Sequence, residues 1–166
     1  MAMTLWDFAL DVYRRPGVSQ ACLGLQDSAG VDVNVTLYIL WRIAVRADQV
    51  GPADVEEADA AIAEWRARIV EPLRALRRGL KTGPSPAPNA ETATLRGRIQ
   101  AAEIDAEHIE LDTLESLAPP ASSGSLPQDE MKSEARKGLE LVVRFYAGGA
   151  LPDTVIGPIA TLTEAL

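Results

Sequence analysis

Three polar side chains that could bind an ion or a ligand, Asp27, Asp32 and Asn34, flank a glycine between residues 27 and 34. Oxygen ligands around a glycine are typical of calcium loops, but the spacing differs from that of an EF-hand and no glutamate closes the loop. A joint between two helices accounts for the same residues, with Asp27 near the end of one helix and Asp32 or Asn34 capping the next. The joint is the favoured interpretation, and calcium binding is the alternative.

The segment that follows this joint is the most apolar in the chain. From Val31 to Val45, eleven of fifteen residues are apolar, and Arg42 is the only charged residue besides Asp32. A helix that is apolar on nearly all sides belongs at the centre of a bundle. We therefore hypothesise that Asp32, Asn34 and Arg42 form a buried polar set in which each member needs a partner. The candidate residues for binding a ligand or a partner are Asp27, Asp32, Asn34, Tyr38, Trp41 and Arg42.

Other kinds of chemistry have little support in the sequence. The chain has one cysteine, Cys22, and one histidine, His108, so histidine or cysteine metal sites are excluded, and neither residue stands in a catalytic spacing. The acids between residues 54 and 59 are interpreted as favourable charges at a helix N-terminus, although Mg²⁺ between facing helices is an alternative. No nucleotide-binding or nucleophile motif is present. We predict no catalytic residue, no metal and no cofactor.

The composition indicates a globular protein of the cytoplasm. The chain has 166 residues, of which 47% are hydrophobic and 24% charged, and its net charge is −8. Nucleic acid is a poor partner for such an acidic chain, because the phosphate backbone repels it. The first residues lack the pattern of a signal peptide, and no apolar run is long enough to span a membrane. Neither nucleic-acid binding nor membrane insertion is expected.

Hydrophobic periodicity and the glycine and proline joints predict only helices around the candidate residues. Alternating valines between residues 31 and 36 would also suit a strand, but no partner strand is visible. The predicted fold is a single-domain, all-α bundle of about six or seven helices. It has a core at residues 4–117, a flexible linker at 118–127 and C-terminal helices at 128–166.

Two long helices are predicted to fold back on each other as a kinked antiparallel hairpin. The first carries an apolar stripe and bends at Pro72, and the second runs from about residue 91 to 117. Residues 62–81 have a net charge of +4 and residues 82–117 a net charge of −5, which favours pairing along the hairpin. The predicted inward positions are Val55, Ala58, Ile62, Trp65, Ile69, Leu73, Leu76 and Leu80 in the first helix and Leu95, Ile99, Ala102, Ala106 and Ile109 in the second.

The first part of the chain resembles a known family. The resemblance rests on residues 5–10, on Pro16-Gly17-Val18, on residues 22–34 with their Leu-Gln-Asp and Gly-x-Asp-Val-Asn elements, and on the apolar helix that follows. Residues 65–77 also fit, so the similarity extends over roughly residues 5–117. The family consists of small proteobacterial proteins of unknown function. The resemblance implies a bacterial helical protein and assigns no chemistry to any residue.

Two functions from different classes remain open. The first is a non-enzymatic interaction or accessory module of the bacterial cytoplasm, whose partner is an unidentified protein or a second copy of the chain; apolar C-terminal residues such as Ile156 and Leu162 could contribute to its surface. The second is a helical enzyme or a binder of a small apolar, prenyl-like ligand in the bundle core, lined by Tyr38 and Trp41. The missing catalytic patterns favour the interaction module.

Overall fold

The computed structural model describes residues 3–120 and 124–166, and these residues are helical with short connections. Within them a short π-helical segment joins α4 and α5 into one continuous helix, so that seven helices result. None of the described helices combines the length and the apolarity needed to cross a membrane. The elements are α1 (Leu5–Tyr13), α2 (Val18–Ala29), α3 (Val33–Ala44), α4 (Pro52–Trp65), the π-helical segment (Arg66–Val70), α5 (Glu71–Gly79), α6 (Ala90–Leu117), α7 (Gln128–Tyr146), a 3₁₀ turn (Asp153–Val155) and α8 (Ile156–Glu164).

The apolar helix α3 lies at the centre of the molecule, as its composition predicts. Every residue from Val35 to Ile43 is buried. The helix packs against α1, α4, α6 and α7, so its sides are covered by neighbours. The alternating valines do not form a strand, because Asp32 accepts a hydrogen bond from the Val35 amide at 2.9 Å and starts a helix there.

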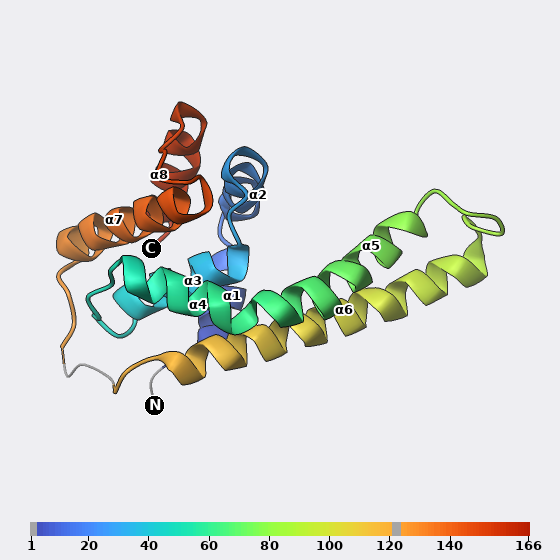
Figure 1. Ribbon diagram of the computed structural model, residues 1–166, viewed down its shortest axis with the longest axis horizontal. Coiled ribbons are helices and arrows are strands. Elements are labelled where there is room, and N and C mark those ends of the chain that lie inside the picture. The colour runs from blue at the N-terminus through green and yellow to red at the C-terminus, as the bar shows by residue number, and fades with distance from the viewer. Residues whose placement is uncertain (1–2, 121–123) are drawn as a thin grey trace.

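The hairpin extends away from this body as a long arm (Figure 1). Its first helix runs through α4 and α5, and α6 returns from the tip and continues beneath the body. Where α5 and α6 lie side by side, arginines of α5 pair with glutamates of α6. The predicted kinked antiparallel hairpin with complementary charges is therefore confirmed.

The kink has a local cause at Pro72. Proline has no amide hydrogen and its ring clashes with the carbonyl four residues earlier, so a regular helix cannot continue through it. The chain responds with the π-helical turn, in which the Glu71 amide donates to the Arg66 carbonyl five residues earlier. This extra residue per turn shifts the inward face by one position, so Val70 is buried and Ile69 is exposed.

The predicted stripe of α6 is wrong at most of its positions. Leu95 and Ile109 are exposed, and Ala106 is the only member of the stripe that is buried. The reason is that α5 and α3 approach α6 on the face that carries Glu103, Glu110 and Leu114. The polar side chains on that face form ion pairs and hydrogen bonds with the neighbouring helices, so the face does not need to be apolar.

The C-terminal helices α7 and α8 pack on the same body. α7 lies against α3, and α8 lies against α2 (Figure 1). Leu139, Val142 and Val143 of α7 join the core around α3. Pro158 stands in the first turn of α8, where a proline needs no hydrogen-bond partner and does not interrupt the helix.

Candidate functional site

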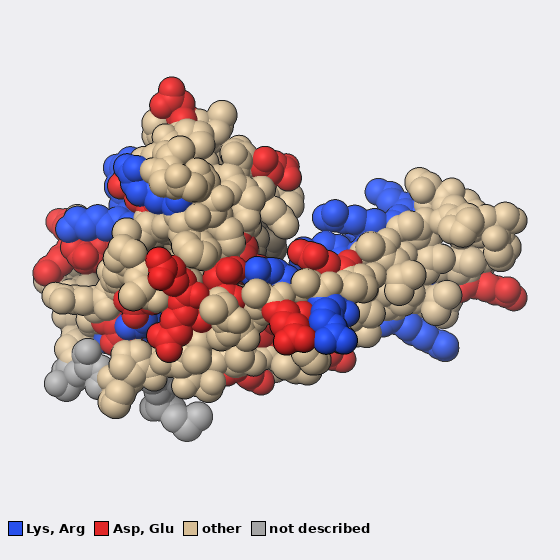
Figure 2. Space-filling view, in the orientation of Figure 1, with Lys and Arg blue, Asp and Glu red and all other residues tan. Residues whose placement is uncertain are grey.

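A cleft of about 470 Å³ lies between the body and the hairpin. It is lined by residues of α1, α2 and the start of α3 on the body and by residues of the π-helical segment, α5 and α6 on the hairpin. Figure 2 shows the surface hollowed where the hairpin leaves the body, with Lys and Arg side chains on the hairpin side. The two sides of the cleft therefore differ in composition.

The body side of the cleft is mainly apolar. Leu10 and Tyr13 of α1 and Leu23 of α2 line it, and Ile104 of α6 adds an apolar side chain from the hairpin side. Each of the four has between 37% and 45% of its surface exposed. Trp6 also lines the cleft and stacks on His108, with ring centroids 3.9 Å apart. Four large side chains from three helices thus keep apolar surface in contact with water in one place.

At the base of the cleft, Arg66 links three elements. Its guanidinium donates to Asp32 at 3.0 Å and to Asp59 at 2.9 Å. Asp59 also accepts a hydrogen bond of 2.6 Å from the Tyr146 hydroxyl of α7. Burial alone would lower the pKa of Arg66, but the two carboxylates raise it, and burial together with Asp59 raises the pKa of Tyr146. Arg66 is therefore charged and held in place.

Farther along the hairpin, two arginines of α5 neutralise two glutamates of α6. Arg74 donates to Glu103 at 3.1 Å and to Glu107 at 2.6 Å, and Arg77 donates to both oxygens of Glu103. Glu103 is buried, and although burial raises its pKa, the two guanidinium groups lower it below the ordinary value. This wall of the cleft consists of ion pairs that position one another.

Glu110 is the exception among the carboxyl groups of the cleft. Only 1% of its surface is exposed, and its Oε2 accepts a hydrogen bond of 2.7 Å from the Asn34 amide. Its Oε1 is buried and has no hydrogen-bond partner within the described residues. Burial raises the pKa of Glu110 to about 7; Asp32 and Glu107 add to the rise, and Asn34 and Arg66 oppose it.

The structure divides the six residues singled out from the sequence. Asp32 and Asn34 line the cleft, but Asp27 is exposed on α2 and lies outside it. Tyr38 and Trp41 are buried in the core, where the Trp41 indole donates to the Met3 carbonyl at 2.9 Å.

Arg42, the sixth, is buried in a separate ion-pair cluster. It donates to Asp48 at 3.1 Å and also to Asp54, whose carboxylate accepts the Gly51 amide at the start of α4. Asp32 and Asn34 find their partners elsewhere, in Arg66 and Glu110. Within the described residues, Arg42 therefore shares no partner with Asp32 or Asn34.

The most important residues of the cleft were not identified from the sequence. Glu103, Ala106, Glu110 and Leu114 follow one another at spacings of three and four, which places them on one face of α6. That spacing is a usable signal, but two glutamates within it are typical of a solvated face. Arg66 and Arg74 contribute to the net charge of +4 over residues 62–81, and no pattern in the sequence singles them out.

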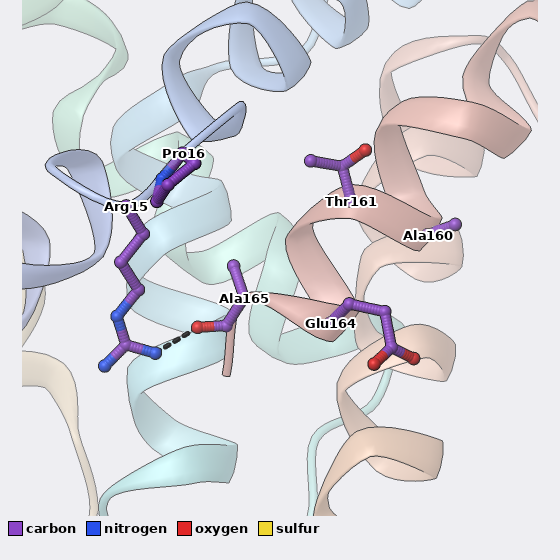
Figure 3. Close-up of a pocket in the computed structure, with 6 residues that line it drawn as sticks. All are labelled: Arg15, Pro16, Ala160, Thr161, Glu164 and Ala165. Carbon is purple, nitrogen blue, oxygen red and sulfur yellow. Dashed lines mark hydrogen bonds between the residues drawn. The ribbon is translucent and has the colours of Figure 1, made fainter.

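A second hollow lies between the α1–α2 joint and α8, and it offers fewer polar groups that could bind a ligand. It is a shallow depression lined by Arg15, Pro16, Ala160, Thr161, Glu164 and Ala165 (Figure 3). Arg15 is already engaged by the Ala165 carbonyl and by Asp11 at 2.7 Å. Glu164 points away from Arg15 and accepts from Lys132 at 2.7 Å. The cleft at Glu110 is the stronger candidate.

Neither the histidine nor the cysteine contributes a reactive group to the cleft. Cys22 is buried, and burial raises the pKa of its thiol to about 11, so it is protonated at neutral pH. His108 is held by its stack on Trp6. Over residues 3–120 and 124–166, no three His, Cys, Asp or Glu side chains are grouped as ligands for one metal ion.

Comparison with known proteins identifies a family. Residues 4–114 match the model of a family described as a protein of unknown function, DUF2390. These residues span α1 to the last turns of α6 and include every residue that lines the cleft. No curated protein and no solved structure matches the chain.

Proposed function

This chain belongs to the DUF2390 family of proteins of unknown function, and we propose that it is a non-enzymatic interaction module that binds a segment of a partner protein in the cleft. The observation that carries the proposal is the convergence of Leu10, Tyr13, Leu23 and Ile104 on one hollow with their apolar surface exposed. An apolar centre beside a polar rim is the composition of a protein interface.

The two walls of the cleft define the chemistry of the occupant. The apolar body wall matches an apolar face, and the charged hairpin wall matches a polar face. An amphipathic segment presents both faces at once, and the helix-in-groove mode of recognition uses this arrangement. We infer that the partner supplies such a segment.

The state of the charged side chains favours binding over catalysis. Asp32, Glu103 and Glu107 each already pair with an arginine of the hairpin. Groups engaged in this way position a surface but are poorly placed to exchange protons with a substrate. The proposal also contains no nucleic-acid partner, because four of the six basic residues between residues 66 and 81 already pair with carboxylates of the protein itself.

The resemblance of residues 5–45 to small proteobacterial proteins supports a bacterial cytoplasm as the setting. In that setting the partner is a foreign protein or a second copy of the chain, and crosslinking of the full chain separates the two.

Site-specific photo-crosslinking tests the proposal in cells that express the full chain. A photoreactive residue is placed at Leu10, Leu23 or Ile104 in the cleft, and at Leu95 as a control that is exposed on α6 outside the cleft. We expect the three cleft positions to capture the same protein, which is either a partner or the chain itself, and Leu23→Asp to abolish the capture. Equal capture from Leu95, or none from the cleft, would contradict the proposal.

A small apolar ligand is the second candidate, and the size of the cleft favours it. A volume of about 470 Å³ lies within the range of small-molecule sites. The ligand would occupy the cleft and not the core around Tyr38 and Trp41, because those residues are buried among packed side chains. Native mass spectrometry of the purified chain distinguishes the two: a retained molecule that is lost in Leu23→Asp would support the small ligand.

A further inference from the structure

The ion-pair network of the cleft contains more carboxyl groups than guanidinium groups. Arg66 pairs with Asp32 and Asp59, and Arg74 and Arg77 pair with Glu103 and Glu107. Glu110 is the fifth carboxyl group beside these three arginines, and within the described residues it forms no ion pair with any of them.

Glu110 belongs to the lining of the cleft, and its oxygen that is unpartnered within the described residues is buried there and not exposed to the open space. Glu110 lines the cleft, and Asn34 holds its other oxygen at 2.7 Å, so the carboxyl group is oriented by the protein. A buried polar atom without a partner costs free energy, and a hydrogen-bond donor from outside would remove that cost. The fold therefore presents an acceptor that is positioned but unused.

The charges around Glu110 favour a cationic donor over a neutral or anionic one. Asp32 and Glu107 are the nearest acidic groups, and Arg66 is the cation that faces it. Arg78, which also lines the cleft, follows Arg77 on α5. The partner of Arg77, Glu103, lies two helical turns and roughly 10 Å from Glu110 along α6. Acid therefore exceeds base at the Glu110 end of the cleft.

The surroundings of Glu110 also suit the stem of a basic side chain. Leu37, Leu111 and Trp6 line the cleft, and Leu111 is the next residue on α6. Lysine and arginine place their methylene groups on apolar surface while the charged end reaches a polar partner. Such a side chain fits both the apolar lining and the carboxyl group at its end.

We propose that Glu110 is the specificity residue of the cleft and binds a lysine or arginine side chain of the partner segment. This inference rests on the proposed function, because it names the group that the bound segment must carry. The ion pair would fix the carboxylate form of Glu110, whose pKa of about 7 leaves it divided between two forms in the free chain. The same pair would provide the cation that the network lacks.

A display library of random short peptides provides the probe for this inference. The full chain serves as bait in three forms: wild type, Glu110→Gln, and Asp105→Asn, which removes one charge from an exposed position of the same helix. We expect wild type and Asp105→Asn to select apolar peptides with a lysine or arginine, and Glu110→Gln to lose that selection. Thermal unfolding checks that each bait is folded.

Affinity measurements on one selected peptide complete the test. Replacing its basic residue by norleucine should weaken binding to wild type by roughly tenfold or more, the range of charge-assisted hydrogen bonds, and should leave binding to Glu110→Gln nearly unchanged. The norleucine peptide tests the inference on wild type alone if the variant is unstable.

The outcomes separate the inference from the proposed function. Selected peptides without a basic residue, or a lysine preference that persists in Glu110→Gln, would overturn the inference and leave the interaction module standing. If wild type selects no peptide that the Leu23→Asp variant fails to bind, both the inference and the proposed function are wrong.

Discussion

At the scale of single residues, Glu110 combines two features that seldom occur together. It is 1% exposed, and one of its oxygens has no partner in the described part of the chain. An ionised carboxyl group in this position loses hydration that Asn34 only partly replaces. The free energy of unfolding should therefore depend on the protonation of this one residue.

We predict that Glu110→Gln changes the pH dependence of stability. The folded-state pKa of about 7 lies above the ordinary value, so the folded chain binds the Glu110 proton more tightly than the unfolded chain. The contribution of Glu110 is thus most favourable below about pH 4.5 and is lost as the pH rises through 7. Relative to wild type, the variant should gain about 2 kcal/mol between about pH 5 and about pH 8.

Denaturant unfolding of both proteins at several pH values measures this difference. Taking the difference between them cancels the titration of shared groups that do not interact with Glu110. Parallel curves for wild type and Glu110→Gln would show that the carboxyl group titrates as an exposed glutamate does.

Arg42 provides a prediction about a buried cation with a structural role. It is 4% exposed and donates to Asp48 and Asp54, which ties the end of α3 to the start of α4. Arg42→Met leaves Asp54 without its guanidinium partner, while Asp48 keeps its contact with Arg46 at 3.0 Å. We expect a loss of about 2–4 kcal/mol in the free energy of unfolding.

The matched control for Arg42 is Arg68, which pairs with Glu64 on the exposed face of the hairpin. Arg68→Met should cost less than about 0.5 kcal/mol, because exposed pairs contribute little. Chemical denaturation of the two variants gives the comparison. Similar losses in both would contradict a structural role for the buried cluster.

At the scale of elements, the contact between α3 and α7 depends on a glycine. A Cβ atom added at Gly138 of α7 would lie 2.7 Å from Ile43 Cδ1 and 3.0 Å from Ile39 Cγ2. Both isoleucines are buried, so they have little room to move. The two helices therefore approach more closely than a larger residue would allow.

Gly138→Ala should destabilise the chain by about 1–2 kcal/mol, because the overlap with α3 outweighs the better helix propensity of alanine. Gly97→Ala in α6 is the control, since a Cβ atom there meets nothing within 4 Å. The control should gain about 0.5–1 kcal/mol from the same change in propensity. Thermal unfolding of both variants checks the prediction, which is wrong if the two shifts have the same sign.

At the scale of the whole molecule, α7 and α8 pack on the body but lie outside the region that the family model matches. The match ends at residue 114, yet Leu139, Val142 and Val143 of α7 bury part of α3. A single domain that spans residues 1–166 stays a prediction. It implies that the matched region cannot keep its core without the C-terminal helices.

We predict that a chain cut after Leu117 loses cooperative unfolding. The apolar surface of α3 that faces α7 would then be exposed to water, and that area is too large to be offset in a small domain. Circular dichroism during heating and size-exclusion chromatography would show a broad transition and association. A sharp transition in the shortened chain would instead identify α7 and α8 as a separate unit.

Much of the fold could be predicted from local patterns. The run of apolar residues from Val35 identifies the central helix, because only the middle of a bundle can cover all sides of such a segment. Opposite charges on two neighbouring helices predict their pairing, which Arg74 and Glu103 confirm. The helix joints follow from glycine and proline, whose backbone preferences are local properties.

Tertiary structure decided which of these residues form a site. Asp32 and Asn34 were visible in the sequence, but their partners Arg66 and Glu110 lie 34 and 76 residues away. Near Pro72 the single-residue shift of the π-helical turn exchanged Ile69 for Val70 on the buried face. Helical periodicity predicts which residues share one face of a single helix. Which face a neighbouring helix covers, and which carboxyl group lacks a cation there, depends on contacts between segments that are distant in the chain.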